Sequence, residues 1–395
     1  MALACAVASA TDEWELNARR VLTSALGFVW QRPQHLLTRF AREMPVVVVE
    51  EPEYHLQLDG ADVRVRRDHG VTVVTPLLPG ITEKYGFGNH VNAEISRLVE
   101  PFVRPGTDPI LWYYTPMALG AEPSTVRPRL TVYDAMDDLA SFRAAPPELR
   151  IREARLLSQV DLVFAGGPTL YRQRRDMHPS VHCFPSGVEA AHFASTTKAA
   201  APDGLAHQRR PILGYYGVID ERLDLDLLAE IADLRPDWTI ALIGPVAKID
   251  EATIPERRNI VRFGQQAYDE LPGFLSCFDV ALMPFARNEA TRAISPTKTL
   301  EYLAGGKPVV STPIADVVSL YGDVVNIAVS GTEFVAAAEA VLNRTNDADR
   351  QWRARASRLV AAHDWDCIAS EMLAVMSRAS TPMIVPAAET AVLSA

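Results

Sequence analysis

The fold is decided by the stretch Ser295-Pro296-Thr297-Lys298-Thr299-Leu300-Glu301-Tyr302-Leu303-Ala304-Gly305-Gly306-Lys307-Pro308-Val309-Val310. It predicts a helix with its own start and stop signals. Ser295 is a favourable N-cap residue, and Pro296 suits the first helical position, where no backbone N–H is needed. Gly305-Gly306 supplies a left-handed end, after which Val309-Val310 opens a short buried strand.

Two charged side chains on this helix point to a ligand. Because residues three apart lie on one helix face, Lys298 and Glu301 are expected side by side near the positive end of the helix dipole. We expect phosphate oxygens at the helix start, near Ser295, Thr297 and Lys298, and ribose hydroxyls donated to Glu301. An ion-paired surface helix is the alternative that these residues leave open.

The same stretch resembles a known family. Pro296, Lys298, Glu301-Tyr302-Leu303-Ala304 and Gly306-Lys307-Pro308-Val309-Val310-Ser311-Thr312 are similar to the donor-site helix of GT-B-fold glycosyltransferases, the bacterial kind that builds cell-envelope and capsular polysaccharides. The resemblance implies an α/β protein of two Rossmann-like domains facing a cleft, with Glu301 holding the donor ribose. Many members carry a second acidic residue where this chain has Ala293, so the retaining mechanism is not carried over.

Composition sets the limits of this interpretation. The chain has 395 residues, of which 48% are hydrophobic, which allows two or three globular domains. Its net charge of −10 argues against a general nucleic-acid-binding protein. The four cysteines show no metal-binding or disulfide spacing and favour a reducing cytoplasm. No apolar run is long enough to span a membrane, and residues 1–10 predict an irregular start rather than an export signal.

Alternating apolar runs and helical patterns predict two α/β units. We expect a first domain over residues 1–192, a linker over 193–210, a second domain over 211–362, and a helix that crosses back, with a weakly ordered tail, over 363–395. The predicted strands are residues 21–29, 45–50, 71–75, 109–114, 130–133, 162–165, 182–184, 212–216, 239–243, 260–263, 280–283 and 309–311. The predicted helices, besides the one that begins at Ser295, are residues 33–42, 223–234, 271–277, 332–342 and 347–378.

Several turns of the second domain are candidates for the donor site. Glycine at a strand-to-helix turn lets the backbone approach a phosphate, so Gly217 and Arg222 are expected at the donor diphosphate. Gly244 and Phe263 lie at the next strand ends, near the expected base, and Asn288 lies in the loop before the key helix. Structural turns without a ligand explain most of these residues as well. Glu289 and Arg292 are candidates for the polar contacts that Ala293 cannot make.

The first domain supplies candidates for catalysis and acceptor binding. The loop Trp30-Gln31-Arg32-Pro33-Gln34-His35 resembles the Arg-Pro-Gln loop of enzymes making teichuronic-acid-type polymers. His35 is a candidate for proton exchange and Arg32 for a phosphate contact, with a packing histidine as the alternative. Asp137 is a candidate base, with a helix cap as the alternative. The remaining acceptor-binding candidates are Trp30, Tyr54, Tyr114 and Asp134.

The sequence lacks a P-loop, a Rossmann glycine fingerprint, a nucleophile elbow, a zinc-protease pair and an Asp-x-Asp metal motif. We therefore expect no metal and no cofactor beyond a UDP- or GDP-type sugar as co-substrate, with Lys298 and Arg222 easing diphosphate departure.

The sequence thus predicts a cytoplasmic, metal-independent glycosyltransferase that acts on a glycan or lipid-linked acceptor, at or near the inner face of the membrane. A nucleotide-sugar 2-epimerase and a non-catalytic sugar-nucleotide-binding protein are the alternatives. Arg172, Arg174 and Arg175 form either a peripheral contact with anionic lipid or, more commonly for such a run, a solvated helix face.

Overall fold

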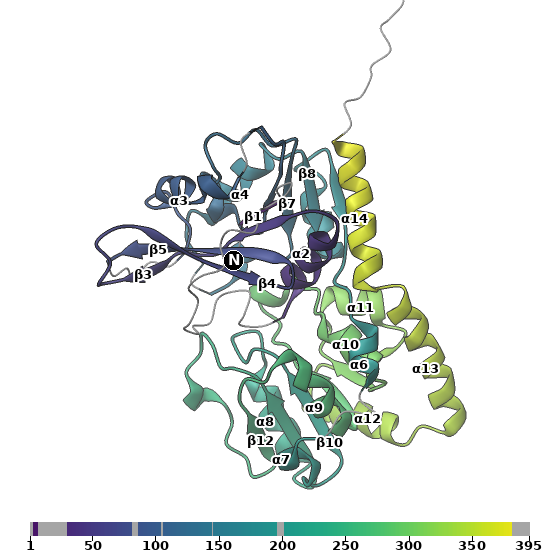
Figure 1. The fold of residues 1–395 in the computed structure, drawn as a ribbon. Helices are drawn as coiled ribbons and strands as arrows, with labels where there is room; N and C mark the ends of the chain where they lie inside the picture. Colours follow the sequence, from purple (N-terminus) through teal and green to yellow (C-terminus); the bar gives the residue numbers. More distant parts are fainter. Residues whose placement is uncertain are drawn as a thin grey trace, which may run out of the picture.

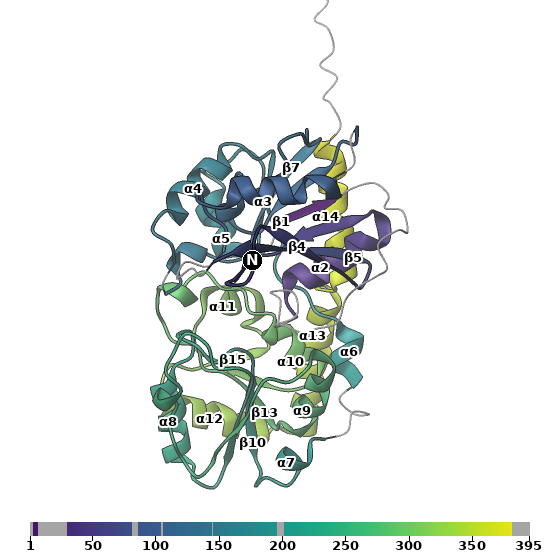
Figure 2. The same ribbon diagram turned by 60° about the vertical axis from the view of Figure 1, so that its left-hand side comes forward.

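The computed structural model describes residues 3–6, 30–80, 86–103, 106–143, 145–195 and 201–380. Figure 1 shows two α/β lobes, one above the other, and Figure 2 shows the same arrangement from a second side. We call the part built on the sheet of β1 to β9 the first lobe, and the part built on the sheet of β10 to β15 the second lobe.

The first sheet runs in the order β3-β5-β2-β1-β6-β7-β8-β9, with β4 paired to β5. β1 is antiparallel to β2 and β6, and β4 is antiparallel to β5, whereas β6 to β9 pair in parallel. The strands are β1 (Leu3–Ala6), β2 (Val46–Val49), β3 (Glu53–His55), β4 (Asp62–Asp68), β5 (Val71–Pro79), β6 (Ile110–Tyr113), β7 (Leu130–Ala135), β8 (Leu162–Ala165) and β9 (Val181–Cys183).

Helices cover both faces of this sheet. On one face, α2 (Arg32–Glu43) and α14 (Trp365–Ala379) share an apolar cluster that includes Phe40 and Met372. On the other face, α3 (Asn92–Val99) and α4 (Leu149–Leu157) pack through residues such as Ile95 and Leu156. The short α5 (Pro168–Arg174) follows β8. Because both faces are covered, strands such as β2 and β6 are buried along their whole length.

The second sheet runs in the order β12-β11-β10-β13-β14-β15, and all its described neighbours are parallel. Its strand order reverses beside β10, which creates a switch point at the carboxyl ends of β10 and β13, where open α/β sheets bind their ligands. The strands are β10 (Ile212–Tyr216), β11 (Thr239–Ile243), β12 (Ile260–Phe263), β13 (Val280–Met283), β14 (Val309–Ser311) and β15 (Val325–Ile327). The helices are α8 (Leu225–Leu234), α9 (Leu271–Cys277), α10 (Lys298–Ala304), α11 (Ala315–Tyr321), α12 (Gly331–Leu342) and α13 (Asn346–Ala361).

The chain crosses between the lobes at two adjacent places. The backbone N–H of Val188 donates to His363 O at 2.9 Å, and that of Trp365 donates to Val188 O at 3.4 Å. Before this crossing α13 packs on the core of the second lobe, and after it α14 packs on the first lobe (Figure 1). The short helices α6 (Ala190–Ala194) and α7 (Asp203–Ala206) lie on the other crossing segment.

Most predicted elements are confirmed. All five strands predicted in residues 212–311 match the structure at both ends, as β10, β11, β12, β13 and β14. The helix predicted over 347–378 is two helices, α13 and α14, because the chain turns at the crossing. The expectation of an irregular start was wrong for β1, and the predicted strand 21–29 lies outside the described residues. β3, β4 and β15 were not predicted, nor were the helices α3, α4, α6, α7 and α11.

The helix predicted to start at Pro296 begins two residues later than expected. α10 starts at Lys298 rather than after a Ser295 cap, because Pro296 and Thr297 form a tighter turn in which Leu300 N donates to Thr297 O at 3.0 Å. The predicted left-handed end is confirmed at Gly306, with φ of +69°.

We predict that Gly187→Ala destabilises the crossing between the lobes. A Cβ there would lie 2.8 Å from side-chain atoms of Ile368 and Trp365 and 2.9 Å from His363 O. Such overpacking typically costs about 1–3 kcal/mol, which thermal unfolding would detect as a lower midpoint. Gly60→Ala is the matched control, since a Cβ there meets nothing within 4 Å. Equal midpoints for the two variants would contradict the tight crossing.

Candidate functional site

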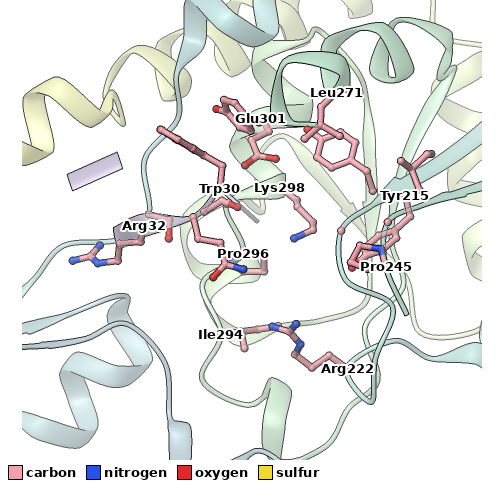
Figure 3. A pocket seen from close by; sticks show the side chains of 18 of the residues that line it. Trp30, Arg32, Tyr215, Arg222, Pro245, Leu271, Ile294, Pro296, Lys298 and Glu301 are labelled. Atoms are coloured by element: carbon pink, nitrogen blue, oxygen red, sulfur yellow. The ribbon is translucent and has the colours of Figure 1, made fainter. Parts of the chain in front are cut away.

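A cavity of about 710 Å³ lies between the lobes, at the switch point of the second sheet. This volume falls within the range that small-molecule sites occupy. Figure 3 shows Trp30 and Arg32 on one side, Tyr215 and Pro245 on the other, and Lys298 pointing into the space between them. The first lobe and the crossing segment contribute Trp30, Gln31, Arg32, Asp68, Met136, Asp137 and Ser186 to the lining.

Lys298 enters the cavity across a glycine. A Cβ at Gly217 would lie 2.1 Å from Lys298 Cε, so any other residue there would displace the end of the lysine side chain. Gly217 also has φ of +138°, a conformation that other residues rarely adopt. Among the described residues, the Lys298 ammonium has no ion pair within 4.0 Å, and burial lowers its pKa, while nearby Glu301 raises it. The cation is therefore available to an anion in the cavity.

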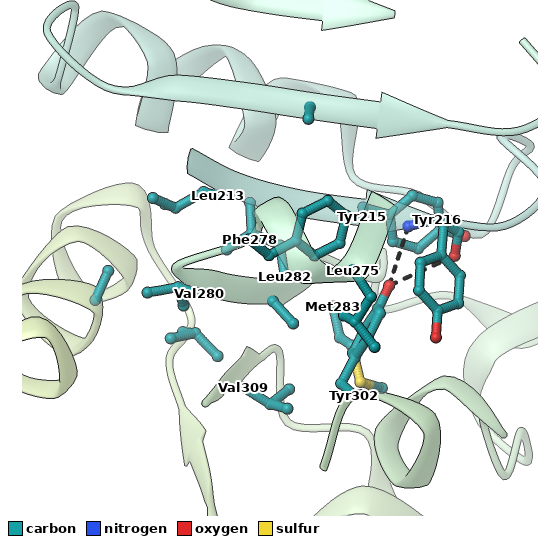
Figure 4. Close-up of a cluster of buried hydrophobic side chains, with 14 of the residues drawn as sticks. Leu213, Tyr215, Tyr216, Leu275, Phe278, Val280, Leu282, Met283, Tyr302 and Val309 are labelled. Carbon is teal, nitrogen blue, oxygen red and sulfur yellow. Dashed lines mark hydrogen bonds between the residues drawn. The ribbon is translucent and has the colours of Figure 1, made fainter. Parts of the chain in front are cut away.

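Glu301 lies one helical turn further along α10 and is 7% exposed. Burial raises the pKa of its carboxyl group, and the positive charge of Lys298 opposes that change. The helix is held in place by the next residue: Tyr302 Oη accepts a hydrogen bond from Tyr216 N at 3.0 Å and donates to Tyr216 O at 3.5 Å (Figure 4). Both charged groups of α10 are thus fixed against the end of β10.

Two glycine turns bring backbone to the cavity wall. Gly244, also at φ of +138°, follows β11, and a Cβ there would lie 2.0 Å from Gly217 O. The turns are joined by a hydrogen bond from Gly217 N to Ile243 O at 2.8 Å. The close approach of the two turns requires glycine at position 244, and the lack of side chains at both glycines leaves backbone at the strand ends accessible to a phosphate group.

A second cation lies beside these turns. The Arg222 guanidinium donates from Nε and Nη2 to the buried Asp220 carboxylate, at distances between 2.6 and 3.0 Å. Burial works against this charge, yet the Asp220 pair raises the pKa of Arg222 overall. Asp220 is therefore not a simple helix cap; Asp224 caps α8 instead, by accepting from Leu227 N at 2.9 Å. The Arg222 guanidinium also lies 5.8 Å from the centre of the Phe142 ring, which belongs to the first lobe.

Asp137 and Asp134 have different surroundings. Asp137 lines the cavity, and burial raises its pKa to about 6, although Arg222 and Arg32 oppose this. Asp134 is fully buried and accepts from Arg32 Nε at 3.0 and 3.1 Å. Burial raises the pKa of Asp134 as well, but its carboxylate is held by Arg32 away from the cavity lining. Asp137 is the one suited to exchange a proton in the cavity.

Four residues predicted for catalysis or acceptor binding do not line the cavity. His35 is 2% exposed, its Nδ1 accepts from Trp30 Nε1 at 3.0 Å, and its ring stacks on Trp365 at 4.9 Å. Burial lowers its pKa well below the usual value, so it is the packing histidine of the alternative interpretation. The Asp134 carboxylate accepts hydrogen bonds from Arg32. Tyr114 is buried beside Trp112, and Tyr54 packs at the edge of the first-lobe core.

Two predicted donor-site residues also lie elsewhere. Phe263 packs against Phe274 at 5.4 Å, and Asn288 caps a short turn by accepting from Thr291 N at 3.1 Å. Arg32 does line the cavity, where its guanidinium is paired with Asp134 and donates to Phe184 O at 2.8 Å. The structure places the other predicted residues at the lining: Trp30, Asp137, Gly217, Arg222, Gly244, Ser295, Thr297, Lys298 and Glu301.

Asp68 and Tyr268 both line the cavity but were not predicted from the sequence. Tyr268 stacks on His192 at 4.4 Å and on Trp30 at 5.7 Å, and its hydroxyl donates to Glu189 at 3.1 Å. No local motif marks it. Asp68 had a signal, because it precedes His69-Gly70, a pair that suits a tight hairpin turn.

Two further observations concern only the described part of the chain. No group of three or more His, Cys, Asp or Glu side chains is arranged there to hold a metal ion. None of its helices combines the length and the apolar character needed to cross a bilayer.

Arg174, expected on a solvated or lipid-facing run, is instead 4% exposed and paired with Glu153 at 2.7 Å.

Sequence comparison connects the second lobe with a known family. Residues 210–347 match the family model of "Glycosyl transferases group 1". The chain is also 26% identical, over 235 residues, to TuaH of Bacillus subtilis (strain 168), which is named as a teichuronic acid biosynthesis glycosyltransferase. That alignment covers 57% of this chain and 59% of TuaH. The resemblance drawn from residues around Lys298 and Glu301 is confirmed.

Solved structures identify the fold. A sucrose-phosphate synthase from Thermosynechococcus elongatus has a TM-score of 0.63 at 14% identity, covering 88% of this chain and 92% of that one. A UDP-forming trehalose-phosphate synthase from Burkholderia xenovorans, solved with glucose-6-phosphate, has a TM-score of 0.59 at 14% identity, covering 84% and 93%. The protein has the GT-B fold of two Rossmann-like units.

We predict that the Asp137 carboxyl group titrates near pH 6, because its burial disfavours the charged form. It should be neutral below that pH and negatively charged above it. Carbon-13 NMR of carboxyl-labelled aspartate would measure the midpoint, with the signal assigned by its loss in Asp137→Asn. A midpoint near the ordinary value of ~3.9 would contradict the predicted burial.

Proposed function

We propose that this protein is a glycosyltransferase that moves a sugar from a nucleotide-diphosphate donor to an acceptor hydroxyl. The observation that carries the proposal is the meeting of Lys298, Arg222 and Glu301 in one cavity, at the switch point of a group 1 glycosyltransferase domain. Two cations beside glycine turns suit a diphosphate, and a neighbouring buried carboxylate suits a pair of hydroxyls.

In this proposal the donor binds mainly to the second lobe. The diphosphate lies between the Lys298 ammonium and the Arg222 guanidinium, against the turns of Gly217 and Gly244. The Glu301 carboxylate accepts hydrogen bonds from the ribose hydroxyls. The base is of the UDP or GDP type and lies toward Pro245, at the end of β11. Lys298 packs on Gly217, so its position is set before the donor arrives.

The reaction breaks the bond between the anomeric carbon and the diphosphate oxygen, and the electron pair leaves with the nucleoside diphosphate. Lys298 and Arg222 stabilise the negative charge that develops on that leaving group. The acceptor oxygen forms the new bond to the anomeric carbon, and its proton passes to the Asp137 carboxylate, which is charged above about pH 6. We propose that these fixed cations serve where other transferases use a metal ion, and that no cofactor takes part.

The acceptor is proposed to be a hydroxyl of a glycan or of a lipid-linked precursor. The support is the similarity to TuaH, which is named for teichuronic acid biosynthesis. A cytoplasmic location is part of the proposal, since Cys183, Cys277 and Cys367 are free thiols, as a reducing compartment favours.

We predict that Lys298→Ala lowers turnover by roughly 100- to 1000-fold, the usual effect of removing one preorganised electrostatic group from an active site. Glu301→Ala should weaken donor binding by roughly tenfold or more, because hydrogen bonds to a charged group are lost. Release of nucleoside diphosphate and calorimetric binding of UDP and GDP would measure the two effects.

Glu289→Ala and Arg292→Ala are the matched controls, because these two charged residues are exposed and pair with each other at 2.8 Å, outside the cavity lining. Both controls should retain normal activity. Near-normal rates in both Lys298→Ala and Glu301→Ala would refute the site. Rearrangement of the donor sugar in the absence of any acceptor would show an epimerase instead.

A further inference from the structure

The tip of one hairpin reaches the cavity from the first lobe. In the register of β4 and β5, Asp68 pairs with Val71, so His69 and Gly70 alone form the turn. Both have positive φ, 47° and 84°, as a type I′ turn requires. This turn places Asp68 in the cavity lining and packs the His69 ring edge-on against Trp30, at 5.2 Å between ring centres.

The Asp68 carboxylate is held in place but not covered. Its Oδ1 lies 2.5 Å from His69 Nδ1, and its Oδ2 lies 4.0 Å from Arg66. Arg66 makes its closer ion pair, at 3.0 Å, with the buried Glu50. The Asp68 side chain remains 38% exposed, so its oxygens can accept hydrogen bonds from a molecule in the cavity.

The two walls of the cavity differ in charge. The second-lobe wall carries the Lys298 and Arg222 cations. The described part of the first-lobe wall carries two carboxylates, Asp68 and Asp137, and its cation Arg32 is ion-paired with the buried Asp134. A phosphate group would be attracted to the second lobe and repelled by the first.

The rest of the described first-lobe wall is uncharged. Trp30 contributes a partly exposed indole, although its ring also contacts His35, His69 and Tyr268. Gln31 adds an amide next to it. An aromatic surface beside carboxylate and amide groups suits the C–H face and the hydroxyls of a sugar ring.

We propose that Asp68, Trp30 and Gln31 form a subsite for an uncharged sugar ring of the acceptor, and that this subsite rejects a phosphorylated one. The inference rests on the proposed function, because it assigns the acceptor half of the same cavity. Asp68 is the specificity-determining residue: it accepts hydrogen bonds from sugar hydroxyls and repels a phosphate group.

The test uses the full chain saturated with UDP or with GDP. Saturation-transfer NMR measures binding of p-nitrophenyl glycosides of glucose, galactose, mannose and N-acetylglucosamine, and of glucose 6-phosphate. We expect at least one neutral glycoside to bind and glucose 6-phosphate not to compete with it. Asp68→Ala should weaken the neutral glycoside by roughly tenfold to a hundredfold, and Asp68→Lys should admit glucose 6-phosphate.

Asp62→Ala, at the exposed far end of the same strand, is the control and should bind like the unaltered protein. Calorimetry with UDP and GDP shows whether each variant keeps its donor site, and all three should. The proposal is overturned if no neutral glycoside binds while a nucleotide does, if glucose 6-phosphate binds as tightly as the best glycoside, or if Asp68→Ala changes nothing. Failure of both nucleotides to bind the unaltered protein would instead remove the proposed function, and this subsite with it.

Discussion

The site depends on the contact between a lysine side chain and a glycine. The Lys298 side chain passes over the turn after β10, where a Cβ at Gly217 would lie 2.1 Å from Lys298 Cε. The same turn contacts the turn after β11, through Gly217 O and Gly244. Helix α10, the turn after β10 and the turn after β11 are distant in sequence, and they meet here because both turns have glycine at the contact. The hydrogen bonds between Tyr302 and the backbone of Tyr216 fix α10 over this junction. The lysine is thus positioned by backbone packing and needs no ion pair to hold it.

The burial of ionisable groups gives the cavity its chemical asymmetry. Burial lowers the pKa of Lys298 and raises the pKa of Glu301. Each charged group opposes the effect of burial on the other, because the two charges have opposite signs. Arg222 and Arg32 only partly oppose the effect of burial on Asp137, and its pKa stays raised at about 6. Asp134 is fully buried and accepts a hydrogen bond from Arg32. Desolvation thus acts on both carboxyl groups, but only one of them is left free to exchange protons.

Local sequence patterns correctly predicted the strands and helix faces whose structure depends on residues close together in the chain. β10 and β11 are continuous apolar runs followed by glycine or proline, and the spacing of Lys298 and Glu301 defines their common face. β4 was missed because its arginines break the apolar pattern, although Val63 and Val65 still alternate. The role of His35 could not be predicted, because it depends on the tertiary contact with Trp365 and on the hydrogen bond from Trp30. The His69-Gly70 turn that carries Asp68 has a local signal, but the contact of this turn with Trp30, beside the cavity, is a tertiary contact that no local pattern encodes.

The interface between the lobes explains the residue that departs from the family pattern. Ala293 stands where the resemblance described above implies an acidic residue. It is 2% exposed and packs with Ala165 and Leu170 of the first lobe. A carboxylate there would be buried against apolar groups, at a cost that only a cation or several donors would offset. Close by, Asp316 of the second lobe accepts hydrogen bonds from the N–H and hydroxyl of Thr169, at the start of α5. Ala293 therefore contributes to the packing of one lobe on the other, and in the proposed function the charges that act on the donor come from Lys298, Arg222 and Glu301.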